Sequence, residues 1–255
     1  MADTRSDIIS KVPAVTFGFW MIKIFATTLG EIGGNAFSMS LNWGYAISTA
    51  MFAVIFVISV IAQIGASRFR PALYWFAIIA STTVGTTTAD MVTRDLGIGY
   101  SGGSLILLFL VLATLAIWRV STGTVSVGSV SSPKTEIFYW LTITFSQTLG
   151  TALGDWFADT AGFGYLGSAI IFGIVLLAIY ALHRFTELSR PAIFWAAFIL
   201  TRPLGAVVGN VIDKPAASGG LEIGRFTASG ILLAMIVVMI ALFPHKAAVD
   251  DRVTQ

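Results

Sequence analysis

Long apolar stretches alternate with short polar segments along the whole chain. Residues 45–66, 104–118, 165–182 and 226–243 form the clearest of these stretches. Most of them approach the roughly 20 residues that an α-helix needs to cross the hydrocarbon core of a bilayer. The pattern predicts an all-α fold, a polytopic membrane helical bundle, and not a soluble domain.

Polar and apolar positions repeat four times in one register. Each copy has a tryptophan ten residues before a glycine, an acid or amide five residues after that glycine, and another glycine fourteen residues after it. The four sets are Trp20, Gly30, Asn35 and Gly44; Trp75, Gly85, Asp90 and Gly99; Trp140, Gly150, Asp155 and Gly164; and Trp195, Gly205, Asn210 and Gly219. Self-similarity at a fixed period indicates stacked copies of one unit. We number positions in each copy from its first glycine, so the tryptophan is at −10.

The length of each copy predicts two helices. Successive tryptophans are 55, 65 and 55 residues apart, which allows two membrane crossings with their turns. We expect eight transmembrane helices from four two-helix repeats, the first helices forming a central bundle and the second helices an outer layer facing lipid. The longer middle spacing divides the chain into a first membrane half at residues 15–120 and a second half at 135–243. A polar linker at 121–134 joins the halves, and residues 1–14 and 244–255 are expected to be tails.

Composition and charge support this assignment and predict an orientation. The chain is 56% hydrophobic and only 11% charged. Its lysines and arginines lie mainly in the tails, the linker and the loops between copies, and the positive-inside rule therefore places those segments in the cytoplasm. We expect a bacterial inner-membrane protein with both termini cytoplasmic. Because the basic residues are not clustered on a soluble face, nucleic acid is not expected as a partner.

The sequence gives little support for an enzyme. It has no cysteine and only two histidines, His183 and His245, which lie at predicted helix ends. It contains neither a His-Glu-x-x-His motif nor a P-loop. We therefore expect no enzymatic activity and no cofactor.

Small and polar residues form a stripe along the first helix of each copy. They recur at −3, 0, +1, +4, +5 and +8, which is one face of a helix. Glycines spaced by four residues allow membrane helices to approach closely. The expected helix-packing residues are Gly30, Gly34, Gly85, Gly150, Gly154, Gly205 and Gly209.

Three acidic residues on this stripe are predicted to lie deep in the membrane. The −10 and +14 positions bracket about 36 Å of helix at 1.5 Å per residue. Glu31 at +1 is then almost at the midplane, and Asp90 and Asp155 at +5 lie about 4 to 5 Å toward the outer side. A carboxylate near the bilayer centre costs on the order of 2.5 to 3.5 kcal/mol on insertion scales. Helix packing alone does not require that cost, so the acids indicate an ion or proton pathway.

Other polar residues complete the predicted site. The ion-binding set is Glu31, Asp90, Asp155, Asn35 and Asn210, and the path-lining set is Thr28, Thr83 and Thr148. Lys23 and Arg202 would either neutralise the acids or bind an anion. Asp95, Asp159 and Asp213 would form an outer vestibule that attracts cations, with solvated loop charge as the alternative.

These residues support three hypotheses for function. The first is secondary transport of a small cation, with or without proton coupling, in which oxygen ligands would favour a hard ion such as Mg²⁺, Mn²⁺ or Ca²⁺. The second is an anion or organic-acid transporter that uses Lys23 and Arg202. The third is a membrane scaffold or sensor whose stripe only assembles helices. The lipid bilayer and a small ion or solute are the expected partners, while the metal and the oligomeric state stay open.

The repeated pattern resembles a known family. Trp20, Thr28-x-Gly30 and Gly34-Asn35 define the pattern, which recurs in all four copies over residues 17–243 apart from changes in the fourth. It is similar to bacterial integral membrane proteins with four tandem two-helix repeats of unknown function (DUF347-type repeat). The resemblance implies a fold but no activity. Pro203 replaces the threonine of the other copies, and a proline there is expected to loosen or kink its helix.

Overall fold

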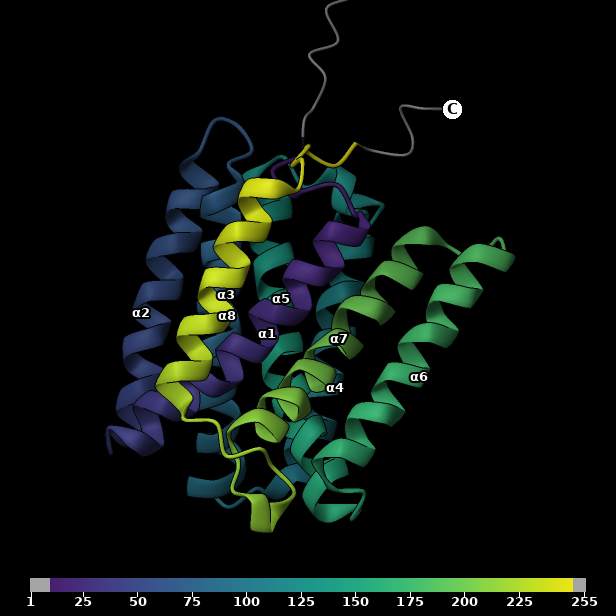
Figure 1. Ribbon diagram of the computed structural model, residues 1–255. Coiled ribbons are helices and arrows are strands. Elements are labelled where there is room, and N and C mark those ends of the chain that lie inside the picture. Colours follow the sequence, from purple (N-terminus) through teal and green to yellow (C-terminus); the bar gives the residue numbers. More distant parts are fainter. Residues whose placement is uncertain (1–9, 250–255) are drawn as a thin grey trace, which may run out of the picture.

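The computed structural model describes residues 10–249 and is all-α within that range (Figure 1). Its eight helices are α1 (Phe17–Asn35), α2 (Gly44–Gly65), α3 (Pro71–Asp90), α4 (Gly99–Thr122), α5 (Pro133–Asp155), α6 (Gly164–Phe185), α7 (Arg190–Asp213) and α8 (Arg225–Leu242). Two helices fall in each of the four copies. The predicted all-α fold and the presence of two helices in each repeat are therefore confirmed for the described residues.

Local sequence explains where the first helices begin. Thr16 accepts a hydrogen bond from the backbone of Phe19 at the start of α1, and Ser132 forms a capping box with Thr135 at the start of α5. A proline lies in the first turn of α3, α5 and α7, where its missing N–H costs nothing. The inter-repeat loops therefore end in standard helix start signals.

Three copies reverse the chain in the same way. A five-residue π-helical turn continues each first helix: η1 (Ala36–Ser40), η2 (Met91–Asp95) and η4 (Trp156–Thr160). The +14 glycines that follow have φ values of 73°, 74° and 66°, a conformation that side chains with a Cβ rarely adopt. The glycine at +14 is thus explained by the turn and not by the site.

The fourth copy departs from this turn. Its first helix, α7, runs unbroken through Pro203 to Asp213 and is followed by Pro215 and the 3₁₀ turn η5 (Ala216–Ser218). The longer loop to α8 then runs along the same end of the molecule as the π-helical turns (Figure 1).

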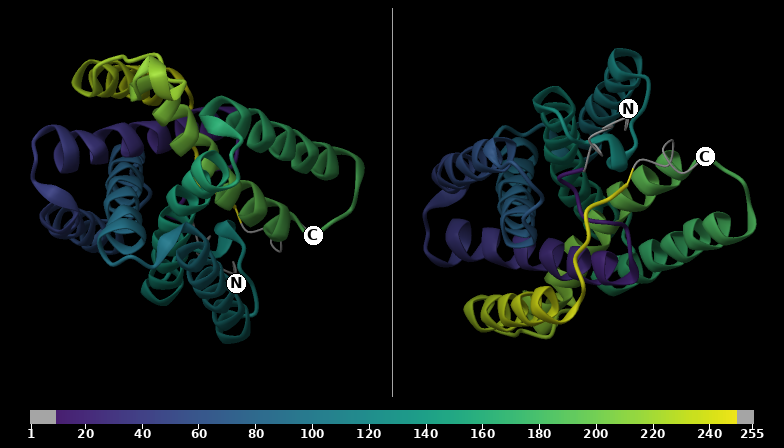
Figure 2. Two further views of the ribbon diagram at one scale, coloured as in Figure 1. Left: turned by 90° about the horizontal axis from the view of Figure 1, so that it is seen from below. Right: turned by 90° about the horizontal axis from the view of Figure 1, so that it is seen from above.

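The helices form a closed ring in which each repeat depends on the next. The first helices α1, α3, α5 and α7 pack in cyclic order, with α7 also packing against α1. The second helix of each copy packs on the first helix of the following copy: α2 on α3, α4 on α5, α6 on α7, and α8 back on α1. Figure 2 shows the second helices around the periphery of this ring. The arrangement agrees with the predicted central bundle and outer layer.

Five helices are long and apolar enough to cross a membrane, namely α2, α4, α6, α7 and α8. The outer members of this set leave large apolar side chains exposed, such as Leu105, Phe109 and Leu177. The other three helices, α1, α3 and α5, carry many polar residues that turn toward the ring interior, which lowers their mean hydropathy. The described residues therefore support a membrane protein with at least five candidate spans, and the expected count of eight stays a prediction.

Chain segments cover the end of the ring where the repeats are joined. The Lys11 amide donates to the Val130 carbonyl over 2.9 Å, and the Ala248 amide donates to the Val12 carbonyl over 2.8 Å. The Trp195 indole donates to the Val125 carbonyl over 2.9 Å. Residues 10–16, the linker and residues 244–248 thus pack together here. We call this the inter-repeat end, and the end with the π-helical turns the intra-repeat end. The predicted tails also include residues 1–9 and 250–255, which lie outside the described residues.

Candidate functional site

Glycines set the spacing of the ring. The glycine at 0 in each copy lies against the −3 residue of the next copy: Gly30 against Thr82, Gly85 against Gln147, Gly150 against Arg202, and Gly205 against Thr27. A Cβ on Gly85 would lie 2.9 Å from the Gln147 Cβ, which is too close for any real contact. The glycines at +4 make similar contacts, with Gly209 close to Glu31. Equivalent positions of the four copies therefore meet as layers inside the ring.

An aromatic layer closes the ring toward the inter-repeat end. Each residue at −11 packs on the −10 tryptophan of the next copy, with centroid distances of 5.5 Å, 5.9 Å, 5.9 Å and 5.8 Å. The pairs are Phe19–Trp75, Tyr74–Trp140, Tyr139–Trp195 and Phe194–Trp20. The hydroxyls of Tyr74 and Tyr139 share a hydrogen bond of 2.6 Å. The repeated tryptophan is thus a packing element between copies.

The +1 layer contains a buried ion pair at the centre of the ring. Arg202 Nη2 lies 3.2 Å from Glu31 Oε2, and the side chains of the pair are 0% and 2% exposed. The hydroxyls of Thr86 and Thr151, both also at +1, lie 3.2 Å and 3.3 Å from the same carboxylate oxygen. Arg202 donates to these hydroxyls over 2.6 Å and 2.5 Å. The fourth copy has Ala206 at +1 and contributes Arg202 from its −3 position instead. All four first helices therefore contribute to this cluster.

The +5 layer lies one helical turn away and is also charged. The Asn35 amide donates to Glu31 Oε1 over 3.4 Å, and the Asn210 amide donates to Asp155 Oδ1 over 3.4 Å. Asp90 and Asp155 are each 1% exposed. The predicted ion-binding residues are thus brought together inside the ring as two adjacent layers.

Arg94 joins the two aspartates and was not among the predicted site residues. Its Nη2 donates to Asp155 Oδ2 over 2.9 Å, and its Nε lies 3.0 Å from Asp90 Oδ1. Nη1 donates to the Tyr45 hydroxyl over 3.2 Å, and the guanidinium also lies near the Tyr100 ring. The Arg94 side chain is 29% exposed at the intra-repeat end. One signal was available in the sequence, because Arg94 follows Asp90 by four residues and so shares its helix face.

Lys23 and Arg202, the predicted counter-charges, have different surroundings. Arg202 is paired with Glu31, whereas no described protein group accepts a hydrogen bond from the fully buried Lys23 Nζ. Lys23 Nζ instead lies 4.0 Å from the centroid of the Phe198 ring. A buried lysine without an acidic partner therefore extends the polar site toward the aromatic layer.

The remaining predicted residues lie around these layers. The buried hydroxyls of Thr28, Thr83 and Thr148 each donate to a carbonyl one turn back on their own helix, and their role as a path lining stays a prediction. Asp95 and Asp159 are exposed at the intra-repeat end. Asp213 is buried and paired with Arg225 Nε at 2.5 Å, which joins α7 to the start of α8.

The acids are arranged for ion pairing and not as a preformed metal site. Each of the three carboxylates lies beside an arginine. Among residues 10–249, no group of three histidine, cysteine, aspartate or glutamate side chains is close enough to hold a metal ion. A hard divalent ion usually takes about six oxygen ligands. The structure therefore gives the expectation of Mg²⁺, Mn²⁺ or Ca²⁺ no direct support.

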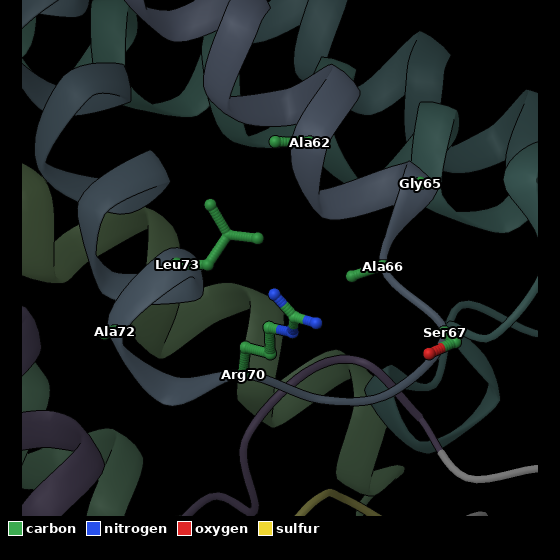
Figure 3. A pocket seen from close by; sticks show the side chains of 7 residues that line it. All are labelled: Ala62, Gly65, Ala66, Ser67, Arg70, Ala72 and Leu73. Atoms are coloured by element: carbon green, nitrogen blue, oxygen red, sulfur yellow. The ribbon is translucent and has the colours of Figure 1, made fainter.

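A pocket elsewhere on the molecule lies apart from these layers. It is found between the end of α2 and the start of α3, and Figure 3 shows the Arg70 side chain reaching into it among small and apolar residues. None of its lining residues belongs to the polar stripe. We therefore assign the candidate site to the ring interior.

Comparison with known proteins agrees with the four-fold architecture. The model of the Repeat of Unknown Function (DUF347) matches at residues 18–69, 73–124, 138–189 and 193–244. No curated protein and no solved structure gives a significant match. The four matches cover most of the chain, and each spans one pair of helices in the ring. The chain therefore belongs to the family defined by the Repeat of Unknown Function (DUF347).

Proposed function

We propose that this protein is a secondary transporter of a small cation, coupled to protons, and not an enzyme. In this proposal all eight helices span the bacterial inner membrane, and both termini and the inter-repeat end face the cytoplasm. The lipid bilayer contacts the second helices, and the solute moves along the axis of the ring. The observation that carries the proposal is the convergence of Glu31, Asp90 and Asp155 in two adjacent buried layers.

Energetics favour an active role for these acids. Buried ion pairs usually add little stability, because apolar residues of similar size are often as stable or more stable in the same place. Ionisable residues inside membrane bundles are costly and generally mark ion or proton pathways. Helix assembly in this ring already has the glycine contacts and the aromatic layer. A scaffold therefore has no use for Glu31 and Arg202 at its centre.

The two arginines suggest how such a site would operate. A cation or proton entering from the intra-repeat end competes with Arg94 for Asp90 and Asp155. Movement of Arg94 away from the aspartates then opens the way to Glu31, whose carboxylate exchanges Arg202 for the cation or a proton. The aromatic layer blocks the other end during this step. Transport would need that layer to open after the intra-repeat end has closed, as alternating access requires.

The first test uses purified protein in liposomes. Uptake of monovalent and divalent cations is measured under an imposed pH gradient, with an internal pH dye reporting proton movement. Asp90→Asn together with Asp155→Asn should abolish cation-dependent proton movement. Glu222→Gln is the matched control, because Glu222 is an exposed acid at the same end outside the predicted site, and it should retain transport. Unchanged transport in the double variant would contradict the proposal.

One observation favours a second candidate function, the transport of an anion. Lys23 is fully buried and no described protein group accepts a hydrogen bond from it, and an anion would supply a partner for its ammonium. Under this alternative Lys23→Met should remove anion uptake while the aspartate variants retain it. Under cation transport the order of effects is reversed. A scaffold or sensor would move no solute in either assay.

A further inference from the structure

The surroundings of Arg94 resemble a binding site for a guanidinium group. Asp155 Oδ2 accepts a hydrogen bond from its Nη2 over 2.9 Å, and Asp90 Oδ1 forms an ion pair with its Nε at 3.0 Å. Two tyrosine rings flank it, with their centroids 6.0 Å and 5.8 Å from the Arg94 Cζ. Carboxylates bind guanidinium groups through directed hydrogen bonds, and aromatic faces attract organic cations. The +5 layer thus presents both elements to one planar cation.

The other copies that form the same turn have no basic residue at the position of Arg94. Arg94 is at +9, within η2, and the equivalent residues of copies 1 and 3 are Met39 and Asp159. Those copies form the same π-helical turn without a basic residue. The arginine is therefore not required to build the turn. Its role is better explained by the aspartates that it contacts.

The fourth copy supplies an internal comparison. Lys214 is the +9 residue of that copy, and its Nζ lies 5.9 Å from the Tyr165 ring. The +5 residues of copies 4 and 1 are asparagines, where Arg94 has aspartates in copies 2 and 3. Two carboxylates, Asp90 and Asp155, thus surround the basic residue at +9 of the second copy, and we call them the carboxylate cage. The basic residue at +9 of the fourth copy has asparagines at the equivalent positions. This difference points to a specific ligand on the side of Arg94.

We infer that the transported cation carries a guanidinium or protonated amine group that displaces Arg94 from Asp90, Asp155 and the two tyrosines. This inference rests on the proposed function and specifies its substrate class. Arg94 then acts as a tethered competitor that keeps the cage filled in the absence of solute. A metal ion fits less well, since the two carboxylates contact two different nitrogens of one planar group, whereas a hard divalent ion usually takes about six oxygen ligands.

The binding test uses free guanidinium with full-length protein. Arg94→Ala removes the tethered group, so guanidinium chloride at millimolar concentration should raise the unfolding midpoint of this variant above that in sodium chloride of equal ionic strength. The double variant Arg94→Ala with Asp155→Asn should lose that increase. Lys214→Ala is the matched control and should respond no more than the wild type. An equal response to sodium in Arg94→Ala would overturn the inference.

The transport test uses wild-type protein and avoids reliance on a variant that fails to fold. Liposomes loaded with unlabelled guanidinium should accumulate labelled guanidinium by exchange, and external methylguanidine should compete while Mn²⁺ and Na⁺ do not. Exchange should persist in Lys214→Gln and be lost in Asp155→Asn. If metal ions or protons move but guanidinium does not, the substrate class is wrong and the proposed function stands. If no cation moves at all, both are wrong.

Discussion

Arg202 crosses directly over Gly150, and a Cβ at that glycine would lie 2.5 Å from the Arg202 Cβ. The contact joins α5 to α7 and directs the guanidinium toward Glu31 in the centre of the ring. Glycine at this position is thus needed both for helix spacing and for the buried ion pair.

Enlarging this glycine should destabilise the ring. Gly150→Ala places a methyl group against Arg202, and overpacking of this kind typically costs about 1–3 kcal/mol. The unfolding midpoint in detergent should therefore fall by several degrees. Gly33→Ala is the control, because a Cβ there meets nothing within 4 Å, and it should be neutral or slightly stabilising. Equal effects of the two variants would contradict the close approach.

The Glu31–Arg202 pair should show strong coupling in a double-mutant cycle. Glu31→Gln leaves the Arg202 charge buried without its partner, and breaking such a pair usually costs about 3–5 kcal/mol. Arg202→Met should be similarly harmful. The double variant should recover much of the lost stability, as measured by thermal unfolding. Additive losses would mean that the two groups are not paired in the folded protein.

The hydroxyl pair in the aromatic layer predicts a smaller coupling. Tyr74→Phe removes one partner of the 2.6 Å hydrogen bond to Tyr139 and leaves the other hydroxyl buried, at a cost of about 1–3 kcal/mol. Replacing both tyrosines with phenylalanine should be less harmful than replacing one. Tyr180→Phe is the control, because Tyr180 is exposed. Stability that falls further in the double variant would argue against the pair.

Closure of the ring can be tested by cross-linking, since the chain has no native cysteine. A Cβ at Gly18 would lie 3.3 Å from the Phe243 Cβ, close to the separation of about 3.5–4.5 Å found in disulfides. Gly18→Cys with Phe243→Cys should form a disulfide under mild oxidation and change migration on denaturing gels. Gly33→Cys with Phe243→Cys should not, because Gly33 lies near the opposite end of α1 and a Cβ there meets nothing within 4 Å. Failure of the first pair would contradict the packing of α8 on α1.

The fold was largely predictable because the repeat carries its own register. The −10 tryptophan, the 0 glycine and the +14 glycine recur at fixed positions, and each has a structural cause in the ring: contact with the next copy for the first two, and a positive φ for the third. The sequence could not show that each second helix packs on the first helix of the following copy. This packing depends on which surfaces fit together across copies, and the hydrophobic pattern of α2 is the same whichever first helix it covers.

The site was predictable in part. The structure brings the acids of the common stripe close together, because equivalent positions of packed repeats meet inside the ring. Their role as ion ligands stays a prediction. Arg94 was missed because it lies at +9, beyond the +8 position where the predicted stripe ends, whereas the π-helical turn continues the helix by five more residues. The pairing of Asp213 with Arg225 was also hidden, since it depends on the longer loop of the fourth copy.

The central claim is that the buried aspartates of the ring bind a moving cation. Charge movement in reconstituted membranes, recorded as a transient current after a rapid rise in guanidinium or metal-ion concentration, tests it most directly. The wild type and Glu222→Gln should give a current that depends on the cation. The Asp90→Asn and Asp155→Asn double variant should give none. A current of wild-type size in that double variant would contradict the account.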